Sequence, residues 1–317
     1  MGELAFKGEV IDWKNSVLLF DKRKGVTSYK AIEEAGRLLG TRKIGHSGTL
    51  DRAASGLLVI CTGSATRLTQ YFLGSDKRYT ATIRLGTVTD TDDGEGAVIE
   101  TRDAAHIDER MIGEALKVFL GSIKQRAPLY SALKIRGKRA SDRARMGQEV
   151  PLKERDIRID SIDILSMDGE RKSVVLDVRC SKGTYIRSLA RDLGEKLGTG
   201  AFLEDLRRTE SGRFRVEDAA SIEDLQEIVG SGTEAPACRI GPFDALESFG
   251  FIAVSADARR KVLNGAAFDR SEAVEIRGGA GTIYCIGDDG KNLFAIADMD
   301  IDNWTIRYLN VFNEPLH

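Results

Sequence analysis

Two segments of alternating side chains constrain the fold of this chain more than any other feature of its sequence. In residues 77–86 every second side chain is apolar, and residues 173–180 repeat the pattern. The apolar positions are Tyr79, Ala81, Ile83, Leu85, Val174, Leu176 and Val178. Alternation with a period of two predicts strands that turn one face to a core and the other to polar surroundings.

Helical patterns lie between these strands in irregular order. Residues 28–40 form an amphipathic segment that Thr27 or Ser28 can cap and Gly40 can end. Residues 107–120 and 184–197 are two further amphipathic segments, each followed by a glycine, and residues 17–20 and 57–60 are short apolar runs typical of buried strands. Because no regular βαβ order is present, the pattern predicts an α+β fold rather than a doubly wound sheet.

A second domain is predicted after residue 242. The chain has 317 residues, enough for about two domains, and residues 230–236 have the composition of a linker. After it we expect a short helix at 255–265 and strands at 273–277, 281–287, 293–301 and 304–312. We therefore predict a catalytic domain over 1–242 and a small β-rich domain over 243–317.

The composition narrows the chemistry and the location. Four scattered cysteines without a CxxC pair and only three histidines argue against a metal or disulfide centre. Acid–base work must therefore rest on carboxylates, tyrosines or His46. No apolar run approaches the roughly 20 residues that cross a bilayer, and the charged first residues do not form a signal peptide, so we expect a cytoplasmic protein.

Charge is unevenly distributed along the chain. The net charge is −2, but residues 244–317 hold 7 Lys/Arg against 12 Asp/Glu, whereas residues 124–155 hold 10 basic and 3 acidic residues. The basic side chains around Gly137 are Lys134, Arg136, Lys138, Arg139, Arg143 and Arg145. A surplus of this size is unusual for a solvated surface segment, so we expect this insertion to hold the phosphates of a polyanion.

The loop Gly45-His46-Ser47-Gly48-Thr49-Leu50-Asp51 is the first candidate for catalysis. Taken alone, an aspartate in a Gly/Ser/Thr-rich loop is usually a turn or helix-cap residue. The loop lacks the Gly-Lys-Ser/Thr ending of a phosphate-binding loop, so that interpretation is rejected.

The same loop, followed by Ala54-Ser55-Gly56-Leu57-Leu58, resembles the catalytic motif of the tRNA pseudouridine synthase B (TruB) family. Further matches follow in family order over about residues 15–215. They are Leu18-Leu19-Phe20-Asp21-Lys22, Gly25-Val26-Thr27-Ser28, Lys77-Arg78-Tyr79, Thr89-Asp90-Thr91-Asp92-Asp93, Tyr130-Ser131-Ala132-Leu133-Lys134, Lys182-Gly183-Thr184-Tyr185-Ile186-Arg187 and Leu206-Arg207-Arg208-Thr209. A single match would be weak, but the ordered series is specific.

This resemblance implies a pseudouridine synthase fold, with a mixed, largely antiparallel sheet flanked by helices and a C-terminal domain similar to the PUA module. It implies isomerisation of a flipped-out uridine in the T loop of tRNA, at position 55. The reaction rearranges one nucleotide, so no cofactor or metal is expected, and the expected partner is the T arm of tRNA, bound by a monomer.

Family position also assigns roles to individual residues. Asp51 matches the catalytic carboxylate, and Tyr79 matches the tyrosine that packs on the flipped base. His46 matches a histidine beside the flipped-out region, and Tyr185 and Leu206 match positions that line the uracil pocket. Without the motif, Tyr79 and Leu206 would pass as core residues and His46 as an ordinary turn residue.

Arg187 supports an inference that is independent of family. It falls in the first turn of the predicted helix at 184–197, where the helix dipole disfavours a cation by about 0.3–1 kcal/mol. A cation there needs a carboxylate partner. We predict an ion pair with Asp51, with Asp90 or Asp93 as competing partners.

The chain departs from the family pattern at several positions. Arg23 and Arg52 stand where prolines are usual, Arg126-Ala127 replaces a hydrophobic–proline pair, and Ser141 replaces a tyrosine. Loss of proline beside Asp51 is expected to reduce the preorganisation of the loop.

Three alternative functions remain open from the sequence. One is a non-catalytic tRNA-binding or tRNA-folding chaperone, which would have no need of Asp51. Another is the catalytic subunit of a guide-RNA pseudouridylation particle. A third is a glycoside hydrolase with Asp51 and Asp90 or Asp93 as its carboxylates, which the scarcity of tryptophan and the basic insertion disfavour.

Overall fold

The structure, a computed structural model, describes residues 13–130, 134–135, 138–139, 154–231, 237–279, 281–288 and 292–316. Most of the basic insertion lies outside these ranges, including Arg136, Arg143, Arg145 and Ser141. For Lys134, Lys138 and Arg139 only the backbone is described, in the short strands β8 (Lys134–Ile135) and β9 (Lys138–Arg139). The predicted grip on phosphates therefore stays a prediction.

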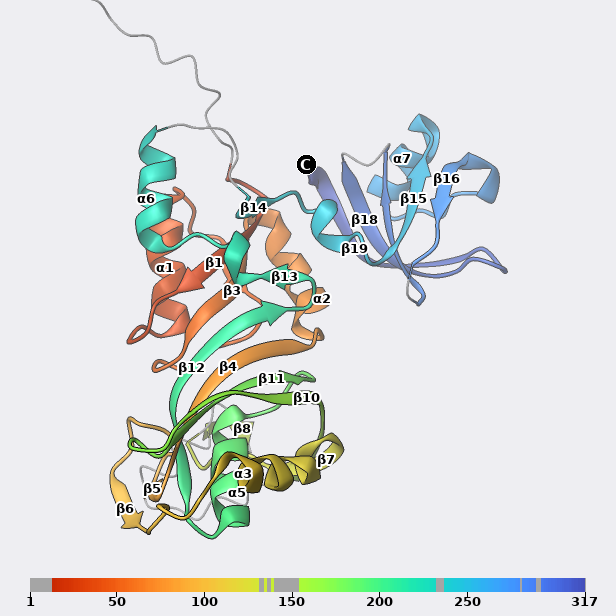
Figure 1. The fold of residues 1–317 in the computed structure, drawn as a ribbon. Coiled ribbons are helices and arrows are strands. Elements are labelled where there is room, and N and C mark those ends of the chain that lie inside the picture. Colours follow the sequence, from red (N-terminus) through yellow and green to blue (C-terminus); the bar gives the residue numbers. More distant parts are fainter. Residues whose placement is uncertain are drawn as a thin grey trace, which may run out of the picture.

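A ten-stranded mixed sheet organises the larger part of the described chain (Figure 1). Its main path runs β14 (Arg239–Ile240), β1 (Val17–Lys22), β3 (Ser55–Thr62), β12 (Ala201–Ser211), β4 (Lys77–Leu85), β11 (Ser173–Cys180), β10 (Glu154–Asp168) and β7 (Gly121–Arg126). β2 (Ile44–His46) pairs with β3, and β13 (Phe214–Arg215) pairs with β12. Among these described strands only β12 and β3 pair in parallel, so the expected largely antiparallel α+β fold is confirmed.

The two alternating segments are neighbours in this sheet. β4 and β11 pair antiparallel, with Ala81 opposite Leu176 and Tyr79 opposite Val178. Their apolar faces cover one core together with the helices α3 (Glu109–Leu116) and α5 (Ile186–Leu197). Cross-strand apolar pairs of this kind stabilise a sheet and hold its register.

The helices begin and end where local chemistry favours it. The Thr27 side chain caps α1 (Ser28–Leu38) by accepting from the Lys30 amide, and Asp108 caps α3 in the same way through Met111. α5 ends at Gly198, whose φ of 75° is a left-handed conformation that glycine adopts without strain. The remaining elements of this part are η1 (Gly63–Leu68), α2 (Thr69–Leu73), β5 (Thr87–Thr89), β6 (Val98–Thr101), η2 (Lys117–Phe119), η3 (Val216–Asp218) and α6 (Ile222–Ser231).

The C-terminal part forms a separate five-stranded sheet, in the order β16 (Ala273–Arg277), β15 (Gly250–Val254), β17 (Ile283–Gly287), β18 (Leu293–Asp300) and β19 (Thr305–Leu316). The same part contains the helical segments η4 (Asp244–Leu246), α7 (Ala256–Leu263) and η5 (Arg270–Glu272). The prediction of a β-rich C-terminal unit is confirmed. β15 was not predicted as a strand, and the predicted boundary at residue 243 stays a prediction.

The C-terminal sheet packs against η1 and α2, two helical segments of the larger part of the chain. Phe312 and Leu293 belong to the same buried cluster as Leu68, which lies in η1. The Tyr71 hydroxyl donates to Asn310 Oδ1 at 2.7 Å. A shared core means that removal of the C-terminal part would expose apolar surface of the remainder.

No helix in the described ranges has both the length and the apolar character needed to cross a membrane.

Candidate active site

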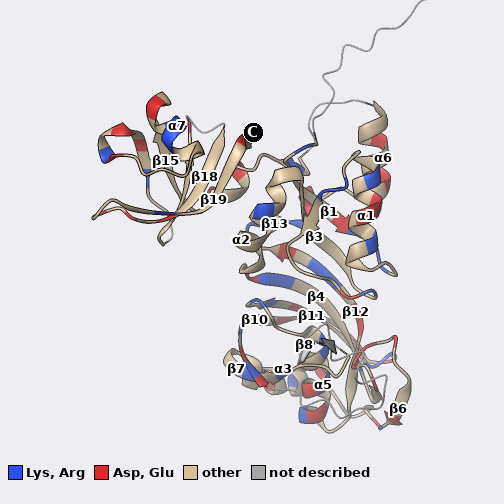
Figure 2. Ribbon diagram, turned by 180° about the vertical axis from the view of Figure 1, so that it is seen from behind, with Lys and Arg blue, Asp and Glu red and all other residues tan. Residues whose placement is uncertain are grey.

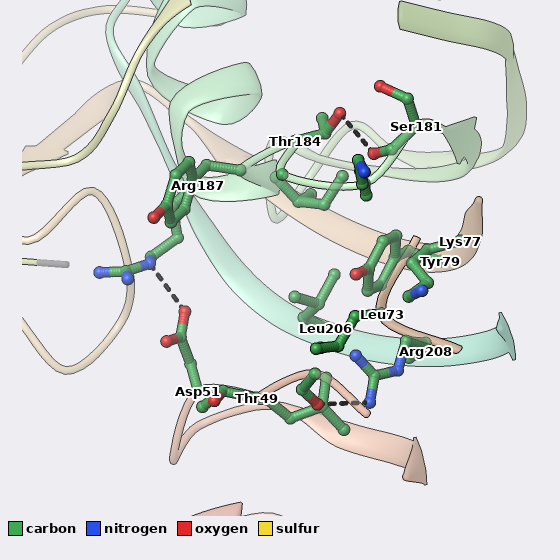
Figure 3. Close-up of a pocket in the computed structure, with 16 residues that line it drawn as sticks. Thr49, Asp51, Leu73, Lys77, Tyr79, Ser181, Thr184, Arg187, Leu206 and Arg208 are labelled. Atoms are coloured by element: carbon green, nitrogen blue, oxygen red, sulfur yellow. Dashed lines mark hydrogen bonds and ion pairs between the residues drawn. The ribbon is translucent and has the colours of Figure 1, made fainter. Parts of the chain in front are cut away.

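A cavity of about 290 Å³ opens where the loop between β2 and β3 faces strands β4 and β12 and the start of α5 (Figure 3). Its lining comprises residues 48–51, Leu73, Lys77, Tyr79, residues 181–187, Leu206 and Arg208. Four segments far apart in the sequence therefore meet at one place. Five of the predicted site residues, Asp51, Tyr79, Tyr185, Arg187 and Leu206, are among the lining residues.

Asp51 lies in the loop between β2 and β3, and hydrogen bonds to Ser28 hold this loop in place. The Ser28 hydroxyl, at the start of α1, accepts from the Leu50 amide at 2.8 Å and donates to the Leu50 carbonyl at 2.9 Å. Two hydrogen bonds from one side chain fix the backbone immediately before Asp51. The Asp51 side chain itself stays 47 % exposed, so a substrate can reach it.

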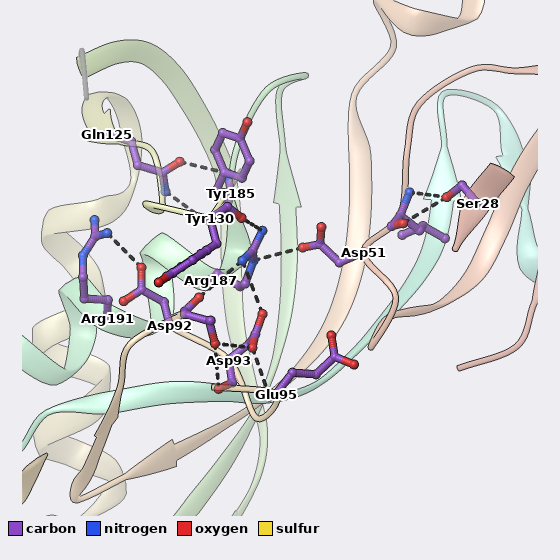
Figure 4. Close-up of polar contacts among 12 residues, drawn as sticks. Ser28, Asp51, Asp92, Asp93, Glu95, Gln125, Tyr130, Tyr185, Arg187 and Arg191 are labelled. Carbon is purple, nitrogen blue, oxygen red and sulfur yellow. Dashed lines mark hydrogen bonds and ion pairs between the residues drawn. The ribbon is translucent and has the colours of Figure 1, made fainter. Parts of the chain in front are cut away.

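Arg187 joins Asp51 to the acidic segment around residue 93, as Figure 4 shows. Its Nε lies 2.9 Å from Asp51 Oδ2 and its Nη1 lies 3.3 Å from Asp93 Oδ2. The guanidinium also donates to the carbonyls of Thr91 and Tyr130. The Nε–Asp51 contact is a close ion pair rather than an aligned hydrogen bond.

The predicted Arg187–Asp51 ion pair is thus confirmed, and Asp93 shares the same cation. Asp90, the other competitor, instead accepts from the Ala97 amide at 2.8 Å. The Arg187 side chain is only 6 % exposed and is held by several contacts, so its guanidinium has a fixed position beside the half-exposed Asp51 carboxylate. This arrangement orients the carboxylate.

Tyr79 and Leu206 form the apolar side of the cavity. The strands β4 and β12 pair with Ala81 opposite Leu206 and Tyr79 opposite Arg208, which places these side chains close together. Burial raises the pKa of the Tyr79 phenol, and the nearby Arg208 guanidinium opposes that rise. Tyr79 is therefore a neutral aromatic surface on which a base can stack.

Tyr185 is held through its backbone at the start of α5. The Gln125 side chain accepts from the Tyr185 amide at 2.9 Å and donates to the Tyr185 carbonyl at 3.0 Å. The Arg155 guanidinium lies 5.4 Å from the centre of the Tyr185 ring, within the range of a cation–π contact.

His46 is not among the residues that line the cavity. It lies on β2, where it pairs with Ile60 of β3. Burial, and secondarily Arg208, lower the pKa of its imidazole, so the side chain is neutral near pH 7. Its role beside the RNA stays a prediction.

Arg52, which stands where the family usually has a proline, forms contacts with two neighbouring segments. Its Nε donates to the Gly25 carbonyl at 3.2 Å, and the Gly25 amide donates to the Arg52 carbonyl at 2.8 Å. Arg52 also lies 3.8 Å from Glu95. Of these contacts, the side-chain bond to Gly25 is one that proline could not form, and the expected loss of preorganisation stays a prediction.

Other departures from the family pattern are also accommodated. Arg23 forms exposed ion pairs with Glu34 of α1 and Glu223 of α6. Ala127 is fully buried, and the Arg126 carbonyl accepts from the Ser188 hydroxyl at 2.9 Å.

Two lining residues, Lys77 and Arg208, were not predicted as site residues. The signal was present, because each lies in a segment that carries the family resemblance, next to Tyr79 and Leu206. The sequence analysis assigned no role to either cation, and both are buried. Among the described residues, no group of three or more His, Cys, Asp or Glu side chains is arranged to hold a metal ion.

Comparisons with known proteins agree with this site. Residues 36–186 match the N-terminal domain of the TruB family pseudouridylate synthases, and residues 187–246 match the tRNA pseudouridylate synthase B C-terminal domain. The tRNA pseudouridine synthase B of Chromohalobacter salexigens is 42 % identical over 260 residues, which cover 82 % of each chain. That of Corynebacterium aurimucosum is 37 % identical over 288 residues, covering 90 % of this chain and 93 % of the relative.

Solved structures resemble the chain over nearly its whole length. A chain in the crystal structure of a Cbf5–Nop10–Gar1 complex gives a TM-score of 0.73 at 25 % identity and covers 95 % of this chain and 85 % of that one. A chain from an H/ACA RNP bound to a substrate RNA containing 2′-deoxyuridine gives 0.72 at 23 % identity, with 97 % and 92 % covered. The second likeness shows the fold alone.

The fold and the family models together define a pseudouridine synthase. The sequence comparisons specify the branch, and the chain belongs to the TruB family. It is an enzyme, a tRNA pseudouridine synthase, and therefore an isomerase. The interpretations as a chaperone without catalysis and as a glycoside hydrolase are thereby excluded.

Proposed function

We propose that this enzyme isomerises the uridine at position 55 in the T loop of tRNA, with Asp51 as the catalytic carboxylate. The observation that carries the proposal is the ion pair between Asp51 and the buried Arg187, at the mouth of a cavity walled by Tyr79 and Leu206. A cavity of about 290 Å³ is at the lower end of small-ligand sites and suits one nucleobase rather than a helix. The target uridine must therefore leave its stack to react.

The reaction needs three things from the protein. A carboxylate must attack or stabilise the reacting nucleotide, the glycosidic C–N bond must break, and the freed uracil must be held while it turns to rejoin through C5. In this proposal Asp51 supplies the carboxylate, Tyr79 stacks on the base, and Leu206 and Tyr185 confine it. The C5 proton is released, and the reaction consumes no second substrate.

We further propose that the chain works as a monomer, without guide RNA or partner protein. The similarity to tRNA pseudouridine synthase B sequences, at 42 % and 37 % identity over most of both chains, supports this. The likeness to a Cbf5 chain reflects the common fold and does not require a particle.

A T-arm stem-loop tritiated at uracil C5 tests the proposed function. The purified chain alone should release tritium from the uridine that corresponds to position 55, because bond formation at C5 expels that atom. A stem-loop with cytidine at this position should release none from its remaining uridines. Release from another uridine, or turnover only after a guide RNA is added, would contradict the assignment.

The C-terminal sheet is expected to contribute little to RNA affinity. Its cations are largely paired with neighbouring acids: Arg277 lies 2.9 Å from Glu275, and Arg260 and Arg307 form ion pairs with Asp257 and Asp298. Figure 2 shows acidic and basic segments side by side around α7. Because these charges are paired, they produce little net positive potential that could attract a phosphate backbone.

Substitution of these cations, rather than deletion of the sheet, is the appropriate test, because deletion would disturb the shared core. The double variant Arg260→Gln/Arg307→Gln should weaken tRNA binding by less than about tenfold, roughly 1.4 kcal/mol. Fluorescence anisotropy with full-length tRNA at fixed salt measures this. A larger loss, with unchanged thermal unfolding, would assign the sheet to the RNA interface.

A further inference from the structure

Two cations lie side by side at the end of the cavity opposite the Asp51–Arg187 pair. Figure 3 shows Lys77 and Arg208 next to Tyr79, away from Asp51 and Arg187. Arg208 is 2 % exposed and Lys77 is 7 % exposed, yet both belong to the lining. Such burial of charge is unusual, because Lys and Arg are seldom buried without a partner.

Among the described residues, neither cation forms an ion pair with a carboxylate. Arg208 Nε donates to the Leu57 carbonyl at 2.6 Å and its Nη2 to the Gly48 carbonyl at 3.2 Å. Lys77 Nζ donates to the Ser75 carbonyl at 2.7 Å. Carbonyl oxygens satisfy hydrogen bonds but do not neutralise a charge, so this end of the cavity carries an excess of positive charge.

The first turns of α5 provide the contrast within the same molecule. Arg187 has Asp51 and Asp93 as partners, and Arg191 has Asp92 and Asp192. Buried cations there are neutralised, as the cost of burying a lone charge requires. Lys77 and Arg208 have no such ion-pair partner among the described residues; the only carboxylate that acts on Lys77 is that of Asp76, which does not pair with it.

The reaction supplies a transient negative charge at this place. When the C1′–N1 bond breaks with uracil as the leaving group, the bonding electron pair stays on the base and is shared by the ring nitrogens and O2 and O4. When C5 then bonds to C1′, that charge is consumed, and the proton lost from C5 is balanced by one gained at N1, so the product base is neutral. Lys and Arg side chains only donate hydrogen bonds, so they match the carbonyl oxygens of a uracil anion.

We propose that Arg208 and Lys77 contact the uracil base and stabilise the negative charge that it acquires when its bond to the ribose breaks. The assignment rests on the proposed function, because it requires a uracil in this cavity. It makes both residues catalytic residues, with Asp51 and the two cations acting at opposite ends of one nucleotide.

Titration of Lys77 provides a signature that its own variants can assign, because the pKa of Lys22 is also lowered by burial to about 8. Burial is the largest of the causes that bring the pKa of Lys77 down to about 8; Arg208 on β12 and Lys182 act in the same direction, whereas Asp76 and Cys180 oppose it. Cys180 has a pKa raised to about 12 by burial, and Tyr79 also has a raised pKa, so both stay neutral in this range. Lys77 is protonated below about pH 8 and loses its charge above it.

The kcat/KM of the native enzyme on the T-arm stem-loop should therefore fall as pH rises through about 8, since kcat/KM reports the free enzyme. In Lys77→Arg, whose guanidinium stays charged to above pH 12, this fall should disappear or move to higher pH. Lys117→Arg, at an exposed site in η2, is the matched control and should keep the native profile.

Lys77→Gln tests the charge itself at pH 7. Loss of one such donor should lower the single-turnover rate by roughly 10²-fold, as for other donors to a developing anion, with RNA affinity within about threefold of native. A rate equal to native in Lys77→Gln, or an unchanged alkaline limb in Lys77→Arg, would overturn the proposal. Failure of the native enzyme to act on the T-arm stem-loop would instead contradict the proposed function, so the two failures are distinguishable.

Discussion

Substitution of Asp51 by asparagine is expected to reduce tritium release from the T-arm stem-loop by at least about 10³-fold, equivalent to roughly 4 kcal/mol of transition-state stabilisation. Asparagine has nearly the same shape, but it is neutral and a poor nucleophile, and it cannot form the ion pair with Arg187. The RNA should still bind, since loss of a negative charge does not weaken attraction to phosphates. Single-turnover release and a binding isotherm on the same RNA measure both quantities.

Asp90→Asn is the matched control for this variant. Asp90 is a nearby carboxylate that accepts from the Ala97 amide and does not contact Arg187 in the described contacts. Its variant should retain tritium release within about threefold of native. Native-like turnover in Asp51→Asn would remove Asp51 from the mechanism.

Substitution of Arg187 by glutamine should impair both catalysis and stability. It leaves Asp93, which is 10 % exposed, and Asp51 without their common cation. Loss of one partner of a buried ion pair costs about 3–5 kcal/mol of folding free energy. Asp51 also loses the group that orients it. We therefore expect the single-turnover rate at pH 7 to fall by roughly 10²-fold or more, which is the usual effect of removing one electrostatic contact from an active site.

Arg191→Gln separates the two effects. Arg191 lies one turn further along α5, is similarly buried and pairs with Asp92 at 3.1 Å, but it does not contact Asp51. Urea unfolding should show comparable losses of stability for both variants, whereas only Arg187→Gln should lose most of its turnover. Equal rates for the two variants would show that Arg187 acts through the fold alone.

The parts of this fold that could be predicted are those where local chemistry and tertiary packing agree. β4 and β11 were visible because each keeps one face buried along its length, and α1 because Thr27 caps it. The Arg187–Asp51 pair could be predicted because a cation at a helix start is unfavourable without a partner.

The parts that could not be predicted are those where the pattern is interrupted. β12 carries irregularities between Leu203 and Asp205 and between Arg208 and Glu210, which break its alternation. For the same reason Arg208 was not recognised as an inward-facing residue. The common core of the two sheets was also not foreseen, because contacts between distant segments leave no periodic signal.

The position of β12 has a consequence for how the molecule assembles. β12 comes late in the chain, yet it lies between β3 and β4, which precede it by more than a hundred residues. Until β12 has been synthesised, β3 and β4 each lack the neighbour that covers one of their edges. High sequence separation of this kind slows folding and exposes strands to aggregation. Because Leu206 and Arg208 on β12 line the cavity, the cavity is incomplete until β12 has joined the sheet, which couples closure of the large sheet to completion of the site.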